Sequence, residues 1–198
     1  MRLIERLETG NIYHIFNRGN NGEDIFKEKR NYYYFLLKYE EYCSDVFETY
    51  AYNLLKNHFH LMVNVKEKCI VPRKDGKGEI GLDASKQLSH FFNSYSQSVN
   101  KACNRHGKLF EEPFRRIEVN SDEYFTTLLY YIHFNAQHHR MIKDFRDWEF
   151  SSWHGLLNNE PSFLEKQEVI EWFGNKEHFI KAHLGNAPFD KIGHLIIE

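Results

Sequence analysis

Apolar and polar residues alternate along four short stretches of the chain, which is the pattern of β-strands with one buried face. The four stretches span residues 11–18, 47–55, 58–65 and 115–119. Only Lys56 and Asn57 separate the second stretch from the third, so these two are predicted to form an antiparallel hairpin.

Segments whose apolar residues follow helical spacing lie between the first and second strands, between the third and fourth, and after the fourth. Helices are predicted over residues 27–43, from a cap at Asp83 or Ser85 to about residue 100, from Asn120 to about residue 137, and over residues 163–173. A capping box of Asn120 and Glu123 is expected to begin the third helix. Residues 66–82 are rich in Gly and charged residues and are predicted to be a mobile loop. This order of elements predicts an α+β fold with an antiparallel sheet covered by helices.

Composition argues against a strongly basic nucleic-acid-binding protein, a disulfide-rich protein and a membrane protein. The 198 residues are 41% hydrophobic and carry a formal net charge of -2, so the whole molecule offers no positive field for nucleic acid. The three cysteines lack metal-site spacing and suggest reduced thiols in a cytosolic protein. The first residues contain no apolar signal region and no run approaches membrane length, which favours a soluble, cytoplasmic protein.

The third predicted strand carries two histidines on one face. His58 and His60 alternate with Phe59 and Leu61, so the two imidazoles point to the same side of the sheet. Neutral imidazole binds divalent metals, and two at this spacing can share one ion on an exposed sheet face. Two surface or structural histidines would give the same pattern.

The helix after Asn120 offers a further ligand and a nucleophile. Tyr131 and Asn135 lie four residues apart, hence on one helix face, and Leu128 and Tyr124 extend that face. The amide oxygen of Asn135 can coordinate a hard cation, and the phenol of Tyr131 can attack phosphorus once it is activated. Tyr130 points about 100° away and is expected to be a core residue. An aromatic-rich core helix is the alternative for the whole face.

Between the histidines and this helix, residues 101–116 combine basic and aromatic side chains. Such a combination suits a nucleic-acid backbone with unpaired bases stacked beside it, although a solvated charged hairpin fits equally. The candidate DNA-binding residues of this segment are Lys101, Arg105, Lys108, Arg115 and Arg116.

Five ordered motifs resemble the single-tyrosine HUH transposases, in particular the REP-associated tyrosine transposases and the related IS200-like insertion-sequence enzymes. They are "YHIFNRGNNGEDIF" (13–26), "LLKNHFHLMV" (54–63), "GKLFEEPFRRIEV" (107–119), "LLYYIHFNAQ" (128–137) and "WEFSSWHGLL" (148–157). The chain departs from the family where Asn135 is followed by "AQHHR" in place of Asn-Pro-x-Arg-Ala-Gly, and where residues 66–82 form a longer loop.

The resemblance implies a ferredoxin-like palm in an HUH domain over residues 1–140, with a small C-terminal helical extension over residues 141–198 packed on it. It implies that His58, His60 and Asn135 hold Mg²⁺ or Mn²⁺, and that Tyr131 is the catalytic nucleophile beside the two histidines. It also implies that Arg18, Arg115 and Arg116 face DNA.

The implied activity is metal-dependent cleavage and rejoining of single-stranded, hairpin or palindromic DNA through a 5′-phosphotyrosine intermediate. Two alternatives are a hydrolytic metal nuclease, in which water replaces Tyr131, and a non-catalytic protein that binds DNA hairpins. A monomer is expected, with a homodimer as the alternative, and no membrane partner is expected.

Overall fold

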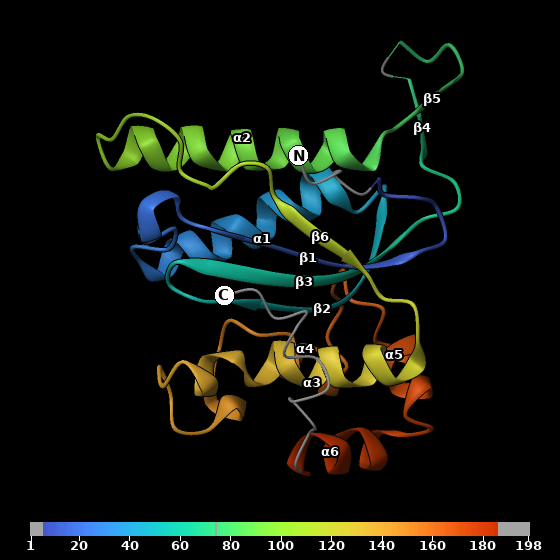
Figure 1. Ribbon diagram of the computed structural model, residues 1–198. Helices are drawn as coiled ribbons and strands as arrows, with labels where there is room; N and C mark the ends of the chain where they lie inside the picture. The colour runs from blue at the N-terminus through green and yellow to red at the C-terminus, as the bar shows by residue number, and fades with distance from the viewer. Residues whose placement is uncertain (1–5, 74, 186–198) are drawn as a thin grey trace.

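The computed structural model describes residues 6–73 and 75–185, and its centre is a four-stranded antiparallel sheet (Figure 1). In chain order the sheet and its first two helices form a βαββαβ unit, and the strands pair in the order β2-β3-β1-β6. The elements are β1 (Ile12–Arg18), α1 (Lys29–Cys43), β2 (Phe47–Leu54), β3 (His58–Val65), α2 (Ala84–Ala102) and β6 (Arg115–Glu118). This is the ferredoxin-like arrangement, so the predicted α+β fold class is confirmed.

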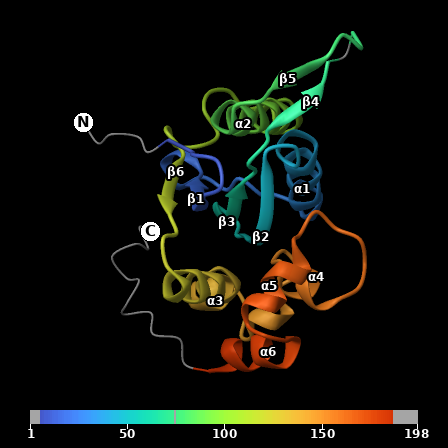
Figure 2. The ribbon, with the colours of Figure 1, turned by 90° about the vertical axis from the view of Figure 1, so that its right-hand side faces the viewer.

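Helices cover both faces of the sheet (Figure 2). On one side α1 and α2 pack together, and on the other side lies a layer of shorter helices around one long helix (Figure 1). This second layer comprises α3 (Asp122–His138), α4 (Trp153–Leu157), α5 (Lys166–Trp172) and α6 (Lys176–Leu184). Two short 3-10 turns, Asn20–Gly22 and Phe145–Asp147, complete the helical elements that the structure describes. None of the described helices is long and apolar enough to cross a membrane.

Alternation along β3 divides its side chains between two hydrophobic cores, as its sequence predicts. Phe59, Leu61 and Val63 are fully buried against α1 and α2, whereas Met62 is buried in the core around α3. His58 and His60 share the Met62 side. The two histidines therefore lie under a helix. The expectation of an exposed sheet face is wrong for His60, whose exposed fraction is only 4%, whereas His58 is half-buried.

Two local predictions differ from the structure. Residues 66–82 contain a small hairpin, β4 (Ile70–Pro72) and β5 (Glu79–Gly81), which projects away from the sheet in Figure 2. The three-residue strands are too short for alternation to reveal them. The N-cap of α3 is Ser121, whose hydroxyl accepts the Tyr124 N–H, so the helix begins one residue later than the expected capping box.

Buried polar bonds join α3 to the described part of the C-terminal segment. His133 Nδ1 lies 2.9 Å from His183 Nε2 on α6, and His133 Nε2 lies 2.7 Å from the hydroxyl of Ser152. Around them Trp153 and Phe179 stack with ring centroids 5.5 Å apart. Burial lowers the pKa of His183 to about 4 and holds the pKa of His133 well below its ordinary value. Both imidazoles are therefore neutral when the protein is folded near neutral pH.

Because His133 and His183 are buried as neutral rings, we expect the protein to be less stable at acid pH. Below pH 6.5 a histidine of the unfolded chain takes up a proton, whereas His183 stays neutral until about pH 4. The unfolded state binds more protons in that window, so the free energy of unfolding falls as the pH falls, by up to ~3 kcal/mol for His183. Urea midpoints at pH 7.5 and 5 should differ less in His183→Gln than in the native protein. If the shift in urea midpoint between pH 7.5 and pH 5 is as large in His183→Gln as in the native protein, His183 does not have this role.

Candidate metal and tyrosine site

The antiparallel register of β1 and β3 brings a third histidine to the pair on β3. His14 lies opposite Met62 and Phe16 lies opposite His60, so His14 shares their face of the sheet. His14 Nε2 is 2.9 Å from His60 Nδ1, and both side chains are buried. Burial lowers the pKa of His14 to about 3. Burial, followed by the charges of the neighbouring histidines, lowers the pKa of His60 well below its ordinary value. Both rings are neutral near pH 7, and each has one lone pair.

His58 reaches the helix across the sheet face. Its Nδ1 lies 2.8 Å from Asn57 Oδ1 and its Nε2 lies 3.1 Å from Asn135 Oδ1 on α3. A neutral His58 that donates from Nδ1 to Asn57 has only a lone pair at Nε2. Two acceptors, Nε2 and the Asn135 oxygen, then face each other. A cation would satisfy both, as would rotation of the Asn135 amide by half a turn.

The buried polar atoms fit a divalent ion. Among the described residues, no hydrogen bond reaches His60 Nε2 or Asn135 Nδ2, although both atoms are buried, and the His60 lone pair could therefore bind a cation. Octahedral coordination at ~2.1 Å places neighbouring ligand atoms about 3 Å apart, which matches the distance from His58 Nε2 to Asn135 Oδ1. Two imidazole nitrogens and one amide oxygen suit Mn²⁺ and accept Mg²⁺. No group of three His, Cys, Asp or Glu side chains suited to a metal occurs among the described residues, and this candidate set has an amide in the third place.

Tyr131 packs directly beside this set. Its ring meets the His60 ring edge to face, with centroids 5.4 Å apart. Tyr130 faces elsewhere, stacks on Phe134 and contacts His183, as expected of a core residue. The exposed fraction of the Tyr131 side chain is only 1%. Its hydroxyl can therefore meet a phosphate only if the groups that cover it move.

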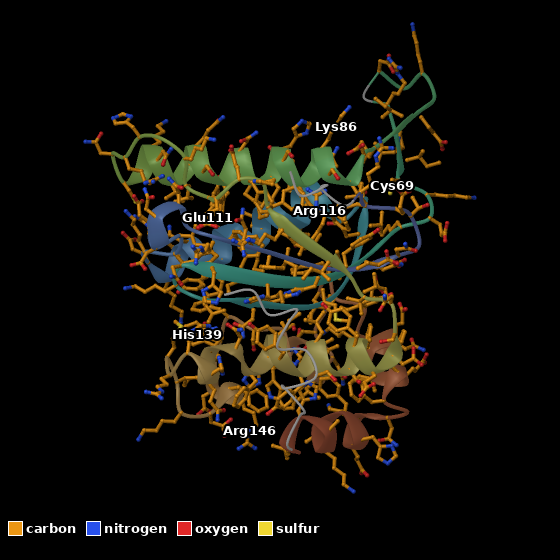
Figure 3. All side chains as sticks on the ribbon, in the orientation of Figure 1. Cys69, Lys86, Glu111, Arg116, His139 and Arg146 are labelled. Atoms are coloured by element: carbon orange, nitrogen blue, oxygen red, sulfur yellow. The ribbon has the colours of Figure 1, made fainter. Side chains whose placement is uncertain are left out.

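A cavity of about 170 Å³ opens beside the histidines. It is lined by His58, His60, Arg18, Arg115 and also by His139, whose ring centroid lies 4.9 Å from that of His58. Figure 3 labels His139 at the end of α3, next to the sheet. Arg18 lies opposite His58 on β1, and Arg115 lies opposite Phe16 on β6, so both guanidinium groups stand on the histidine face.

One carboxylate joins the two arginines of the cavity. Glu111 Oε1 is 2.5 Å from Arg18 Nε, and its Oε2 is 3.5 Å from Arg115 Nη2. A phosphate group binds arginines through the same kind of charged oxygen pair. Glu111 therefore occupies a position between the two arginines that another anionic group could take.

The other basic residues predicted to bind DNA lie away from the cavity. Arg116 follows Arg115 on β6, points to the opposite face of the sheet and covers the Phe114 ring at 3.9 Å. Arg105 pairs with Glu23, and Lys108 pairs with Glu112. Lys101 is exposed near the end of α2. The structure therefore brings Arg18 and Arg115 to the histidines but not the other four.

Sequence reasoning overlooked His14, Asn57, Glu111 and His139. A signal for His14 was present, because alternation along residues 11–18 places it on the same face as Arg18. Its contact with His60 depends on strand register, which a single strand does not reveal. His139 continues the spacing of Tyr131 and Asn135 by a further four residues, so the helix pattern could have indicated it.

Searches with family models and against curated proteins found no match to this chain. A solved structure of a REP-associated tyrosine transposase bound to a REP hairpin resembles it with a TM-score of 0.60. The match covers 81% of this chain and 88% of the other, at 16% sequence identity. The chain thus has the fold of that tyrosine transposase, which confirms the family resemblance of the sequence motifs at the level of the fold.

Proposed function

We propose that the protein is a metal-dependent endonuclease and strand transferase that acts on single-stranded or hairpin DNA through a covalent 5′-phosphotyrosine intermediate. One observation carries the proposal: the fold brings His58, His60, Asn135 and Tyr131, from β3 and α3, to one side of the sheet. The likeness to a transposase solved with a DNA hairpin supports the choice of substrate.

The reaction exchanges one phosphate ester for another. The Tyr131 oxygen attacks phosphorus in line and forms a P–O bond, and the bond from phosphorus to the 3′-oxygen breaks. Tyrosine loses its proton and the departing 3′-oxygen gains one, so the products are a free 3′-hydroxyl and DNA linked to Tyr131 through its 5′-phosphate. Attack by a 3′-hydroxyl reverses the step, and strands can be rejoined without a nucleotide cofactor.

His58, His60 and Asn135 are the residues that would hold Mg²⁺ or Mn²⁺. The ion supplies positive charge that stabilises the negative charge developing on the phosphate. Within the protein, Arg18 and Arg115 line the adjoining cavity and can position the same phosphate group.

His14 acts as a positioning residue in this scheme. For His60 to offer a lone pair from Nε2, its proton must be on Nδ1 and point to His14 Nε2. His14 then accepts that hydrogen bond, which fixes both the tautomer and the orientation of the His60 ring. Stacking of His14 on Phe16, with centroids 4.6 Å apart, holds the acceptor in place.

The bridge from Glu111 to both arginines predicts that this carboxylate competes with DNA. Glu111→Gln removes the negative charge, and affinity for single-stranded DNA should rise roughly twofold to fivefold, as expected for an ion pair of ~0.5–1 kcal/mol. Fluorescence anisotropy at low salt would measure the change. Glu112→Gln alters the net charge equally but frees only Lys108, and should have a smaller effect. A larger effect in Glu112→Gln would refute the competition.

A hydrolytic nuclease is the second candidate, and one observation favours it. Tyr131 does not line the cavity beside His58, where a water molecule could attack phosphorus. The two functions differ in their products. Denaturing gels of the protein with labelled hairpin DNA and Mn²⁺ should show a covalent protein–DNA adduct if Tyr131 attacks, and cleavage without an adduct if water attacks.

A further inference from the structure

The connection between β2 and β3 lies beside the cavity and is held by backbone hydrogen bonds from the segment that follows β1. The N–H of Gly19 donates to the carbonyl oxygen of Asn57 at 2.7 Å. The N–H groups of Ile25 and Phe26 each lie 3.0 Å from the carbonyl oxygen of Lys56. Lys56 and Asn57 are therefore fixed from outside their own hairpin.

Gly19 permits this arrangement because the chain folds back tightly around its Cα atom. A Cβ atom on Gly19 would lie 1.9 Å from the carbonyl oxygen of Glu23, which is far too close for any side chain. The N–H of Gly22 donates back to the Gly19 carbonyl oxygen at 3.0 Å, so the chain turns sharply at this point. Glycine at this position lets the segment reach the connection and hold Asn57 in place.

The side chain of Asn57 contacts one ring nitrogen of the next residue. Asn57 Oδ1 lies 2.8 Å from His58 Nδ1, whereas His58 Nε2 lies 3.1 Å from Asn135 Oδ1. A neutral imidazole has a single proton, so it can donate to one of these oxygens and not to both. With the proton on Nδ1, the Nε2 atom offers a lone pair to a metal. With the proton on Nε2, that atom donates to Asn135 and has no lone pair to offer.

Neighbouring rings restrict the His58 ring itself. The rings of His60 and His139 both meet it edge to face, with centroids 5.3 Å and 4.9 Å away. A half-turn that exchanged the two nitrogens would have to displace these contacts. The position of the proton therefore decides whether the nitrogen that faces Asn135 can bind a metal.

We propose that Asn57 is a positioning residue whose side-chain oxygen holds the proton of neutral His58 on Nδ1 and so keeps the lone pair on Nε2. His60 and His58 then each have an acceptor of their own, His14 on β1 and Asn57 in the connection before β3. The proposal rests on the proposed function for the metal, whereas the tautomer of His58 can be measured without metal.

Nitrogen-15 NMR of the metal-free protein at about pH 8, where an ordinary imidazole is neutral, distinguishes ring nitrogens with and without a proton. Comparison with His58→Gln identifies the His58 signals. We expect the proton on Nδ1 in the native protein and in Asn57→Asp, whose carboxylate also accepts a hydrogen bond. In Asn57→Ala the oxygen of Asn135 remains as an acceptor, so the proton should move to Nε2.

Isothermal titration calorimetry with Mn²⁺, without DNA, measures the consequence for the metal. Asn57→Ala should weaken Mn²⁺ binding by about tenfold to a hundredfold, and Asn57→Asp should bind at least as tightly as the native protein. Asn11→Ala is the matched control, because Asn11 is also half-buried and uses its side chain in a hydrogen bond, to Glu118 at 3.2 Å, at the other end of β1. The control should change neither the tautomer nor the affinity.

Three results would overturn the proposal. The first is a proton on Nε2 of His58 in the native, metal-free protein. The second is Asn57→Ala with the native tautomer and the native Mn²⁺ affinity. The third is a loss of affinity in Asn57→Ala without a change of tautomer, which would assign Asn57 a structural role. If the native protein bound no Mn²⁺, the proposed function would lose its metal, and the tautomers would still decide the role of Asn57.

Discussion

Replacing Tyr131 by Phe should eliminate the covalent protein–DNA adduct while the protein stays folded and binds DNA. The substitution keeps the ring that packs edge to face on His60 and removes the oxygen that attacks phosphorus. Because no other group supplies that oxygen, the expected loss of adduct is complete. Denaturing gels with labelled hairpin DNA and Mn²⁺ would measure the adduct, and thermal unfolding would verify the fold.

Tyr130→Phe and Tyr124→Phe are the matched controls. Tyr130 faces Phe134 and His183 on another side of α3, and Tyr124 is nearly two turns from Tyr131, about 10 Å along the helix axis. Both variants should form the adduct at the native level. If the adduct persists in Tyr131→Phe and disappears in one of the controls, the assignment of the nucleophile to Tyr131 is wrong.

Replacing His14 by Leu should weaken Mn²⁺ binding by about tenfold to a hundredfold, the usual effect of removing a hydrogen bond that orients a metal ligand. Leucine fills much of the buried space but accepts no hydrogen bond, so the proton on His60 Nδ1 has no partner and the ring loses its fixed tautomer. Isothermal titration calorimetry with Mn²⁺, in the absence of DNA, would measure the affinity.

His14→Gln distinguishes positioning from a structural role. Its amide oxygen can accept the hydrogen bond from His60, so Mn²⁺ affinity should recover at least in part. High Mn²⁺ concentrations should restore adduct formation in His14→Leu. If His14→Leu binds Mn²⁺ as the native protein does, or if it loses affinity only because it is unfolded, His14 does not position the ligand.

The fold was predictable from local patterns because each main element carries its own signal. Alternation marked β1, β2, β3 and β6 to within a residue or so at each end, and the Lys56–Asn57 connection identified the hairpin of β2 and β3. The β4–β5 hairpin was not predictable, since its strands are three residues each and contain Gly and Pro. The shift of the α3 cap to Ser121 reflects competition between adjacent capping residues.

The candidate site was predictable where it depends on one element and not where it depends on two. The spacing of His58 and His60, and of Tyr131 and Asn135, placed each pair on one face. Whether these faces meet, and how deeply, depends on the packing of α3 on the sheet, which local patterns do not encode. That packing buries His60 and Tyr131, in contrast to the exposed metal site that the strand alone suggested.

The central claim is that Tyr131 becomes joined to the 5′-phosphate of DNA, and mass spectrometry of the trapped adduct tests it most directly. Native protein would react with hairpin DNA and Mn²⁺, and the adduct would then be digested with nuclease and protease. We expect one modified peptide, with a nucleotide attached through phosphate to Tyr131. A nucleotide on another residue, or cleaved DNA with no modified peptide, would contradict the claim.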